Sequence, residues 1–168
     1  MALWQAVQCK FPGPVQALPN ADASTNIPIF GDFVIPAGFA AADIIEMTGL
    51  PAGYVPWDVT IASEGLGTTL TADVGLMSGD YGKLLDNLGA ARTCGAEFMA
   101  AKALAPAGIY RMDVFAGAVI APTLGDLSTT PFANGDRGIG IKATAIAALT
   151  AGKKIRLQLL CRPRVEGV

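Results

Sequence analysis

The side chains that most often carry out catalysis are scarce in this chain. Its 168 residues include no histidine, which removes Ser–His and Cys–His nucleophile pairs, histidine-bound metals and the commonest general base. The three cysteines, Cys9, Cys94 and Cys161, lie far apart, and a zinc site built of cysteine alone needs four thiolates. We therefore predict a protein that is not an enzyme, with no catalytic residues, no cofactor and no metal ligands.

Two pairs of carboxylates lie close together in the sequence and could serve acid–base chemistry. They are Asp43 with Glu46, and Asp80 with Asp86. A glycosidase needs two carboxyl groups that face each other across a cleft, whereas aspartates in turns usually cap or form the turn. We favour the turn interpretation, and a cleft with facing carboxylates would instead favour a hydrolase.

Two loops resemble ligand sites without meeting their requirements. The segment 65–69, GLGTT, lacks the lysine of a GxxxxGK[ST] phosphate loop and does not open a helix, so we interpret it as a hairpin turn. The loop 122–136 is rich in side-chain oxygens that could bind calcium, but such loops are common and no metal is assigned. Its oxygen-bearing residues are Asp126, Ser128, Thr129, Thr130, Asn134 and Asp136.

The clearest structural signal is a pair of strands over residues 54–77, joined by a turn at 63–67. Apolar and polar residues alternate on both sides of the turn, and a period of two places each set on one face of a sheet. A link of about five residues that contains glycine is typical of a hairpin. We predict that the hairpin is central to the core, through Trp57, Val59, Ile61, Leu70, Val74 and Leu76.

Further strands are predicted over 28–35, 43–48, 109–120, 138–146 and 153–162. In the last of these, the inward side chains are Ile155, Leu157, Leu159 and Cys161. Many short strands with frequent Gly and Pro turns predict an all-β fold, an antiparallel β-sandwich or barrel.

The remaining segments are less regular. Residues 83–105 are rich in helix formers with apolar spacings of three and four, which predicts one short amphipathic helix, with an irregular strand as the alternative. Prolines crowd the first 27 residues, and few regular elements tolerate that density. We therefore predict an extended N-terminal arm over 1–27 and a single β-sandwich domain over 28–168.

Charge is low and unevenly distributed. Charged residues make up 15% of the chain, against about 25% in ordinary soluble domains. Either part of the surface is buried against other subunits, or the chain is simply rich in alanine. Residues 1–136 hold five basic and thirteen acidic groups, whereas 137–168 hold seven basic groups and one acidic group. The basic segment pairs either with acidic strands of the same fold or with another chain.

Three classes of partner or location are not expected. The basic segment has no interleaved aromatic residues of the kind that single-strand nucleic-acid binders use. The first residues lack the basic region and long apolar core of a signal peptide, and the uncharged run 114–125 is too short to span a bilayer. We expect no nucleic-acid partner, no membrane partner and no secretion by a standard signal.

Several segments between about residues 40 and 164 resemble the decoration, or cement, proteins of tailed-phage heads. The segments are ADIIEMTGLPAGYVPWDVTIASEGL, TLTADVGLMSGDYG, ARTCGAEFMAA, and APTLGDLSTTPFANGDRGIGIKATA followed by KKIRLQLLCRPR. The resemblance implies a jelly-roll-like β-sandwich that forms a dimer or trimer, binds the lattice of the major capsid protein, and has no active site.

We accordingly expect a structural virion protein on the outer surface of the capsid, made in the host cytoplasm. The alternative is a carbohydrate- or receptor-binding β-sandwich module of a phage tail or fibre, although the sequence shows no aromatic stripe for sugars. If function lies in contact surfaces, the arm, the loop 122–136 and the basic closing strands are the places to look.

Overall fold

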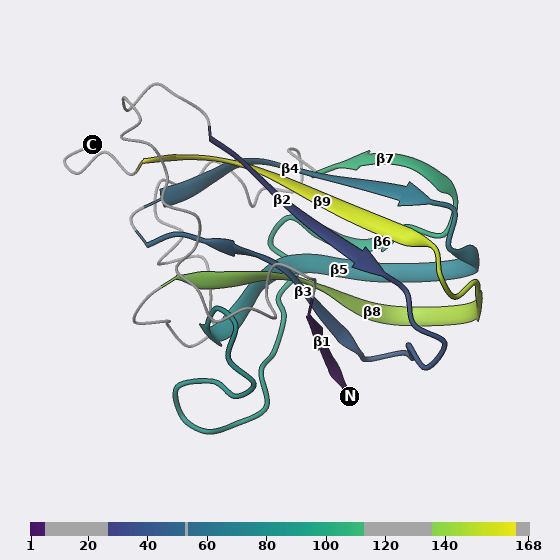
Figure 1. Ribbon diagram of the computed structural model, residues 1–168, viewed down its shortest axis with the longest axis horizontal. Helices are drawn as coiled ribbons and strands as arrows, with labels where there is room; N and C mark the ends of the chain where they lie inside the picture. Colours follow the sequence, from purple (N-terminus) through teal and green to yellow (C-terminus); the bar gives the residue numbers. More distant parts are fainter. Residues whose placement is uncertain (6–26, 53, 113–135, 164–168) are drawn as a thin grey trace.

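The computed structural model describes residues 1–5, 27–52, 54–112 and 136–163, and these form two β-sheets with no helix. Figure 1 shows the sheets stacked face to face as a sandwich. The strands are β1 (Leu3–Gln5), β2 (Ile27–Val34), β3 (Ile44–Leu50), β4 (Tyr54–Glu64), β5 (Gly67–Asp80), β6 (Met99–Ala103), β7 (Ala107–Arg111), β8 (Arg137–Leu149) and β9 (Lys154–Pro163).

Successive strands mostly alternate between the two sheets. One sheet has five strands in the order β1-β3-β8-β5-β6, and the other has four in the order β2-β9-β4-β7. All pairings are antiparallel except that of β1 with β3. The chain therefore crosses from sheet to sheet at most of its turns, and a crossover rather than a hairpin is the dominant connection (Figure 1).

The two strands predicted over 54–77 are present, but the hairpin is wrong. β4 pairs with β7 and β9, whereas β5 pairs with β6 and β8. The link is a corner between sheets: Gly65 has a φ of 86°, and Leu66 is fully buried. The amide of Leu66 donates to the Ala105 carbonyl at 2.7 Å, and its carbonyl accepts from the Thr150 amide at 2.8 Å. These bonds hold the corner between the sheets.

The core lies between the sheets and follows the predicted alternation closely. Five of the predicted core residues are 2% exposed or less: Val59, Ile61, Leu70, Val74 and Leu76. Complete burial of one such side chain typically stabilises the folded state by about 1.5–3 kcal/mol. The inward set predicted for the last strand is also confirmed. Its buried members are Ile155, Leu157, Leu159 and Cys161.

The core position predicted for Trp57 is wrong, because its side chain is 48% exposed. The pairing of β4 with β9 shifts register between Pro56 and Asp58. Such a β-bulge leaves one residue without a partner and interrupts the alternation of faces. Trp57 is that additional residue, so the simple period of two fails at this position.

Four of the other predicted strands are confirmed, and a fifth is described only in part. Those over 28–35, 43–48, 138–146 and 153–162 correspond to β2, β3, β8 and β9. Of the strand predicted over 109–120, the described part forms the end of β7, and residues 113–120 lie outside the described residues. Within the predicted arm, Leu3–Gln5 form β1 and residues 6–26 lie outside the described residues.

The short helix predicted over 83–105 is not found. Residues 81–98 form an irregular loop, and Met99–Ala103 form β6. Gly89, in the middle of the predicted helix, has a φ of 79°, which a right-handed helix does not use. The loop instead follows the rim and outer surface of the five-stranded sheet.

Candidate contact surface at the β5–β6 loop

The most prominent feature outside the sandwich is the segment 81–98, here called the β5–β6 loop. In Figure 1 it is the teal loop that extends away from the sheets between β5 and β6. Gly79 and Gly82 turn the chain into this loop with φ values of 71° and 76°. A Cβ at Gly79 would lie 2.6 Å from the Cα of Asp86, so glycine is required for the close approach of the returning chain.

Three leucines at the end of this loop form an exposed apolar tip. Leu84, Leu85 and Leu88 are 72%, 53% and 82% exposed. Large apolar side chains gathered in this way on a soluble surface usually mark an interaction site. We call these three residues the apolar tip.

Backbone hydrogen bonds and the Asp86 carboxylate fix the shape of the tip. Asp86 Oδ1 accepts from the amides of Leu88 at 2.9 Å and Ala90 at 2.8 Å. The Asp86 amide donates to the Ala90 carbonyl at 2.9 Å, and Leu85 forms an isolated β-bridge with Ala91. Aspartates close turns in this manner by capturing nearby amides. The apolar tip is thus presented in a defined conformation.

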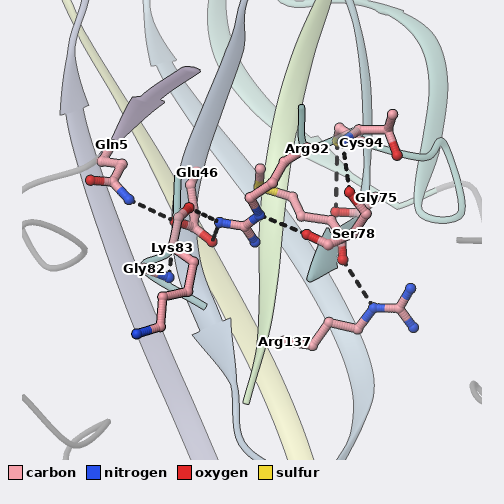
Figure 2. Close-up of polar contacts among 11 residues, drawn as sticks. Gln5, Glu46, Gly75, Ser78, Gly82, Lys83, Arg92, Cys94 and Arg137 are labelled. Atoms are coloured by element: carbon pink, nitrogen blue, oxygen red, sulfur yellow. Dashed lines mark hydrogen bonds and ion pairs between the residues drawn. The ribbon is translucent and has the colours of Figure 1, made fainter. Parts of the chain in front are cut away.

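A buried ion pair anchors the loop to the five-stranded sheet (Figure 2). Arg92 Nη1 lies 2.7 Å from Glu46 Oε1 on β3, and both side chains are fully buried. The same guanidinium donates from Nε to the Ser78 carbonyl at 2.6 Å and from Nη1 to the Lys83 carbonyl at 2.8 Å. One arginine therefore links β3, the end of β5 and the start of the loop.

The Glu46 carboxylate extends this network to two further segments. Its Oε2 accepts from Gln5 Nε2 at 3.1 Å and from the Gly82 amide at 3.2 Å. Burial raises the pKa of Glu46 above its usual value, although Arg92 opposes that effect. Removing charges from water is costly unless they are paired and hydrogen-bonded. This network is therefore a structural requirement of the loop.

Space for the ion pair depends on a glycine of β8. A Cβ at Gly138 would meet Glu46 Oε1 and lie 2.7 Å from Arg92 Nη2. Gly138 pairs with Gly49 in the sheet. The two charged groups thus occupy volume that any larger residue at position 138 would need.

The second half of the loop lies against β5. The Thr93 amide donates to Ser78 Oγ at 2.8 Å, and the Leu76 amide donates to Glu97 Oε2 at 2.9 Å. The side chain of Cys94, in this half of the loop, is buried against β5, and burial raises its pKa to about 12. A thiol with so high a pKa is a poor nucleophile at neutral pH. Cys94 therefore serves packing, not chemistry.

Arg137 borders the same region from β8. Its Nε donates to the Met77 carbonyl at 3.1 Å (Figure 2), and burial lowers its pKa from the ordinary value. Just before it, Asp136 accepts from the Ala52 amide at 2.9 Å through Oδ1 and from the Tyr81 amide at 2.8 Å through its carbonyl. The start of β8 is thereby tied to the start of the β5–β6 loop.

Several chain segments enter or leave the sandwich at this same end. The register places Gln5 beside Glu46, Leu50 beside Arg137, and Tyr54 beside Pro163. Of the places predicted for contacts, the described residues include 1–5 and 27 of the arm, Asp136 of the loop 122–136, and the basic strands. Asp136 lies at the end of the sandwich that carries the β5–β6 loop, whereas Leu3 pairs with Ile44 at the start of β3.

Three of the four carboxylates in the predicted pairs are engaged in structural contacts. Asp43 accepts from the Ala2 amide at 2.6 Å, from Trp4 Nε1 at 2.9 Å and from the Ala40 amide at 3.1 Å, while Glu46 binds Arg92. Asp86 closes its own turn. Within the described ranges, no group of three His, Cys, Asp or Glu residues could hold a metal ion. The calcium hypothesis falls on residues outside those ranges, except Asp136.

The basic closing strand pairs with acidic neighbours in its own sheet. Arg156 Nε lies 2.6 Å from Asp32 Oδ1 on β2, and the Lys154 amide donates to Glu64 Oε2 at 2.9 Å. These residues line an open depression of about 410 Å³ on the outer face of the four-stranded sheet. Two acidic and two basic residues line this depression, so it carries no concentrated charge of one sign.

Sequence reasoning missed the apolar tip altogether. Its leucines were assigned to a helix, where an apolar stripe would face the core. The available signal was the run Asp86-Asn87-Leu88-Gly89, since Asp, Asn and Gly are strong turn formers.

Across the described residues, no helix is both long and apolar enough to cross a membrane.

Comparison with known proteins points to phage capsids. No protein-family model matches the chain, and no curated protein matches it. Its structure is similar to a chain in the capsid of Ralstonia phage GP4, with a TM-score of 0.77 and 29% identity over 98% of this chain and 100% of that chain. A chain of the cyanophage Pam1 capsid asymmetric unit shares the fold, with a TM-score of 0.56 and 17% identity over 90% and 94% of the two chains. The likeness to the GP4 chain supports a structural, phage capsid-related protein, and the likeness to the Pam1 chain concerns the fold alone.

Proposed function

We propose that this chain decorates and stabilises a phage capsid by binding the lattice of the major capsid protein as an oligomer, a dimer or a trimer. The observation that carries the proposal is the end-to-end similarity to a chain of the GP4 capsid, which spans 98% of this chain and all of the other.

We further propose that the sandwich is a jelly roll. Eight strands, β2 to β9, are divided between two sheets with the orders β3-β8-β5-β6 and β2-β9-β4-β7, and β1 adds to the edge of the first. An eight-stranded pair of sheets built from two Greek keys is the arrangement called a jelly roll. The domain then corresponds to residues 28–168, preceded by the arm 1–27.

The physical character of the chain supports a role in assembly. Charged residues amount to only 15% of the sequence, and the described surface displays a preorganised apolar tip. Capsid lattices repeat the same site many times, so an oligomer that engages several sites at once gains avidity from individually modest contacts. The proposed location is the outer surface of the virion, after synthesis in the host cytoplasm.

The proposed role requires no catalysis, cofactor, nucleic acid or membrane. The alternative, a carbohydrate- or receptor-binding module, is not favoured. Among the described aromatic side chains, Phe30 and Trp57 are exposed at 46% and 48%, and they lie on different strands, β2 and β4. A stacking platform for sugars would need several aromatic rings gathered on one face.

A depletion experiment tests the proposal. Capsids of the parent phage produced without this protein should release DNA at a lower temperature and after milder osmotic shock than complete capsids. Adding the purified protein back should restore resistance. Equal resistance with and without the protein, together with no binding on addition, would overturn the proposed function.

A further inference from the structure

We propose that β1 clamps the β5–β6 loop against the outer face of the five-stranded sheet, so that the strand and the loop close and open as one unit. The coupling lies within one chain and is independent of the capsid role proposed above. It rests on the contacts of Leu3 and Gln5 with the region of the loop, and on a separate attachment of β1 to the sandwich.

The register of β1 on β3 divides its three residues between two faces of the sheet. Leu3 pairs with Ile44 and Gln5 pairs with Glu46, and Trp4 lies between them. Successive residues of a strand alternate between the faces, and paired residues of adjacent strands share a face. Leu3 and Gln5 therefore face outward, on the side that the β5–β6 loop covers, whereas Trp4 packs against the main core.

Leu3 completes a small apolar cluster that the loop shares with the sheet. The buried members of this cluster are Ile44 of β3, Met77 of β5 and Cys94 of the loop, and Leu3 packs against them. Cys94 also forms an isolated β-bridge with Met77. Because the cluster is separate from the main core, the burial of Cys94 depends on β1 as well as on the loop itself.

Gln5 connects β1 to the start of the loop through the Glu46 carboxylate. Glu46 Oε2 accepts from Gln5 Nε2 at 3.1 Å and from the Gly82 amide at 3.2 Å, while Oε1 lies 2.7 Å from Arg92 Nη1 (Figure 2). Hydrogen bonds that share a buried charged group support one another. The loss of Gln5 therefore weakens the contacts that Glu46 makes with both loop residues.

The attachment of β1 to the sandwich uses different groups. Asp43 accepts from the Ala2 amide at 2.6 Å and from Trp4 Nε1 at 2.9 Å, and the Ile44 amide donates to the Ala2 carbonyl at 2.9 Å. A short edge strand of this kind opens locally as one cooperative piece. Its opening withdraws Leu3 and Gln5 together, and by reciprocity an open loop weakens the attachment of β1.

Thiol labelling of Cys94 in a Cys9→Ser background tests the coupling, with the buried Cys161 as an internal reporter of global unfolding. The measured quantity is the ratio of the two labelling rates in native buffer. Leu3→Ala/Gln5→Ala should raise this ratio by about tenfold or more, because it removes a hydrogen bond to a buried charge in addition to apolar contacts. Gln5→Ala alone is the milder variant, and it should shift the ratio in the same direction.

Trp4→Ala distinguishes the coupling from the loss of a direct contact. Trp4 faces the core, so this variant leaves Leu3 and Gln5 in place and weakens only the attachment of β1. The labelling ratio should nevertheless rise. Ile29→Ala is the matched control, because Ile29 is also half-buried against the main core on an edge strand, β2, and it should leave the ratio at the wild-type value.

The reverse direction is tested by amide hydrogen exchange. Ser78→Ala removes the acceptor of the Thr93 amide and so loosens the loop. Exchange of the Ile44 amide, which donates to the Ala2 carbonyl of β1, should then become faster. The reference is the Met112 amide, which donates to the Val59 carbonyl in the other sheet and should keep its wild-type rate.

Each other result would overturn the coupling. An unchanged labelling ratio in the β1 variants would show that the loop closes without β1. Equal acceleration of both thiols would show that β1 contributes only to global stability. A ratio that rises in Leu3→Ala/Gln5→Ala but not in Trp4→Ala would show a loss of direct contacts only. Capsids take no part in these measurements, so such a failure leaves the proposed function standing.

Discussion

The β5–β6 loop and the outer face of the four-stranded sheet use similar residues in opposite ways. On the sheet, the Arg156–Asp32 pair is open to solvent, with side chains 59% and 42% exposed, and it separates exposed apolar residues from one another. At the loop, the Arg92–Glu46 pair is fully buried and the apolar residues are gathered outside it. The comparison shows two uses of an ion pair. The exposed pair keeps its surface polar, whereas the buried pair fixes the base of a loop.

The largest expected effect comes from breaking the buried pair. Arg92→Met leaves the Glu46 carboxylate buried without its partner, and such a change typically lowers the free energy of unfolding by about 3–5 kcal/mol. Urea-induced unfolding measures this loss. The double variant Glu46→Leu/Arg92→Met should recover much of it, since no isolated charge remains.

The matched control for that experiment is Arg156→Met on the exposed pair. Its unfolding curve should lie close to that of wild type, because exposed pairs are screened by water and salt. Comparable losses in Arg92→Met and Arg156→Met would show that burial does not distinguish the two pairs.

A smaller but still clear effect should follow from filling the space beside the buried pair. Gly138→Ala places a methyl group against Glu46 Oε1 and Arg92 Nη2, and overpacking of this kind typically costs about 1–3 kcal/mol. Gly38→Ala is the matched control, because no atom lies within 4 Å of a Cβ built there. Thermal unfolding of the two variants should differ, and identical melting temperatures would contradict the tight packing described for Gly138.

The pH dependence of stability should sharpen the contrast between buried carboxylates. Burial would raise the pKa of Asp43, but hydrogen bonds from Trp4 and from the amides of Ala2 and Ala40 hold it below its ordinary value of 3.8. A lowered folded-state pKa means that Asp43 stabilises the fold above pH 3.8 and loses that contribution as the pH falls through its folded pKa.

Asp43→Asn should therefore reduce the free energy of unfolding by about 1 kcal/mol at pH 6, and the difference from wild type should shrink towards pH 2.5. Glu46 has the opposite pH dependence. Burial raises its folded-state pKa, so its contribution to stability is lost as the pH rises through that pKa. A difference between Asp43→Asn and wild type that grows on acidification would contradict the assigned hydrogen bonds.

Thiol labelling gives the smallest perturbation and tests whether the loop stays closed. Cys94 belongs to the β5–β6 loop, with its side chain buried against β5, and Cys161 lies in the core. Burial raises their pKa values to about 12 and about 11. In a Cys9→Ser background, both should resist labelling at pH 8 until the protein unfolds. Labelling of Cys94 well before Cys161 would show that the loop opens independently, contrary to its anchoring.

The positions of most strands could be predicted from the sequence, but their partners could not. The alternation in β4, β5, β8 and β9 reports which side chains face inward, and that pattern is the same whether the next strand lies in the same sheet or the opposite one. Gly65 permits a tight turn in either case. The bonds that decide for a corner, from Leu66 to Ala105 and Thr150, join residues distant in sequence and leave no local signal.

The candidate contact surface was the least predictable part for a related reason. Residues 83–105 are rich in helix formers, and apolar residues in so apolar a segment fall at spacings of three and four by chance. Tertiary contacts can override such a local helix preference. Arg92 pairs with Glu46, which lies 46 residues earlier in the chain, so no local signal reports this contact. The absence of histidine, in contrast, is a property of composition that the sequence shows directly.

A cryo-electron microscopy map of parent-phage capsids, prepared without this protein and then incubated with it, tests the central claim most directly. The account predicts added density at regularly repeated lattice positions on the outer surface. A map identical to that of the capsids alone, at protein concentrations that saturate any binding, would contradict it.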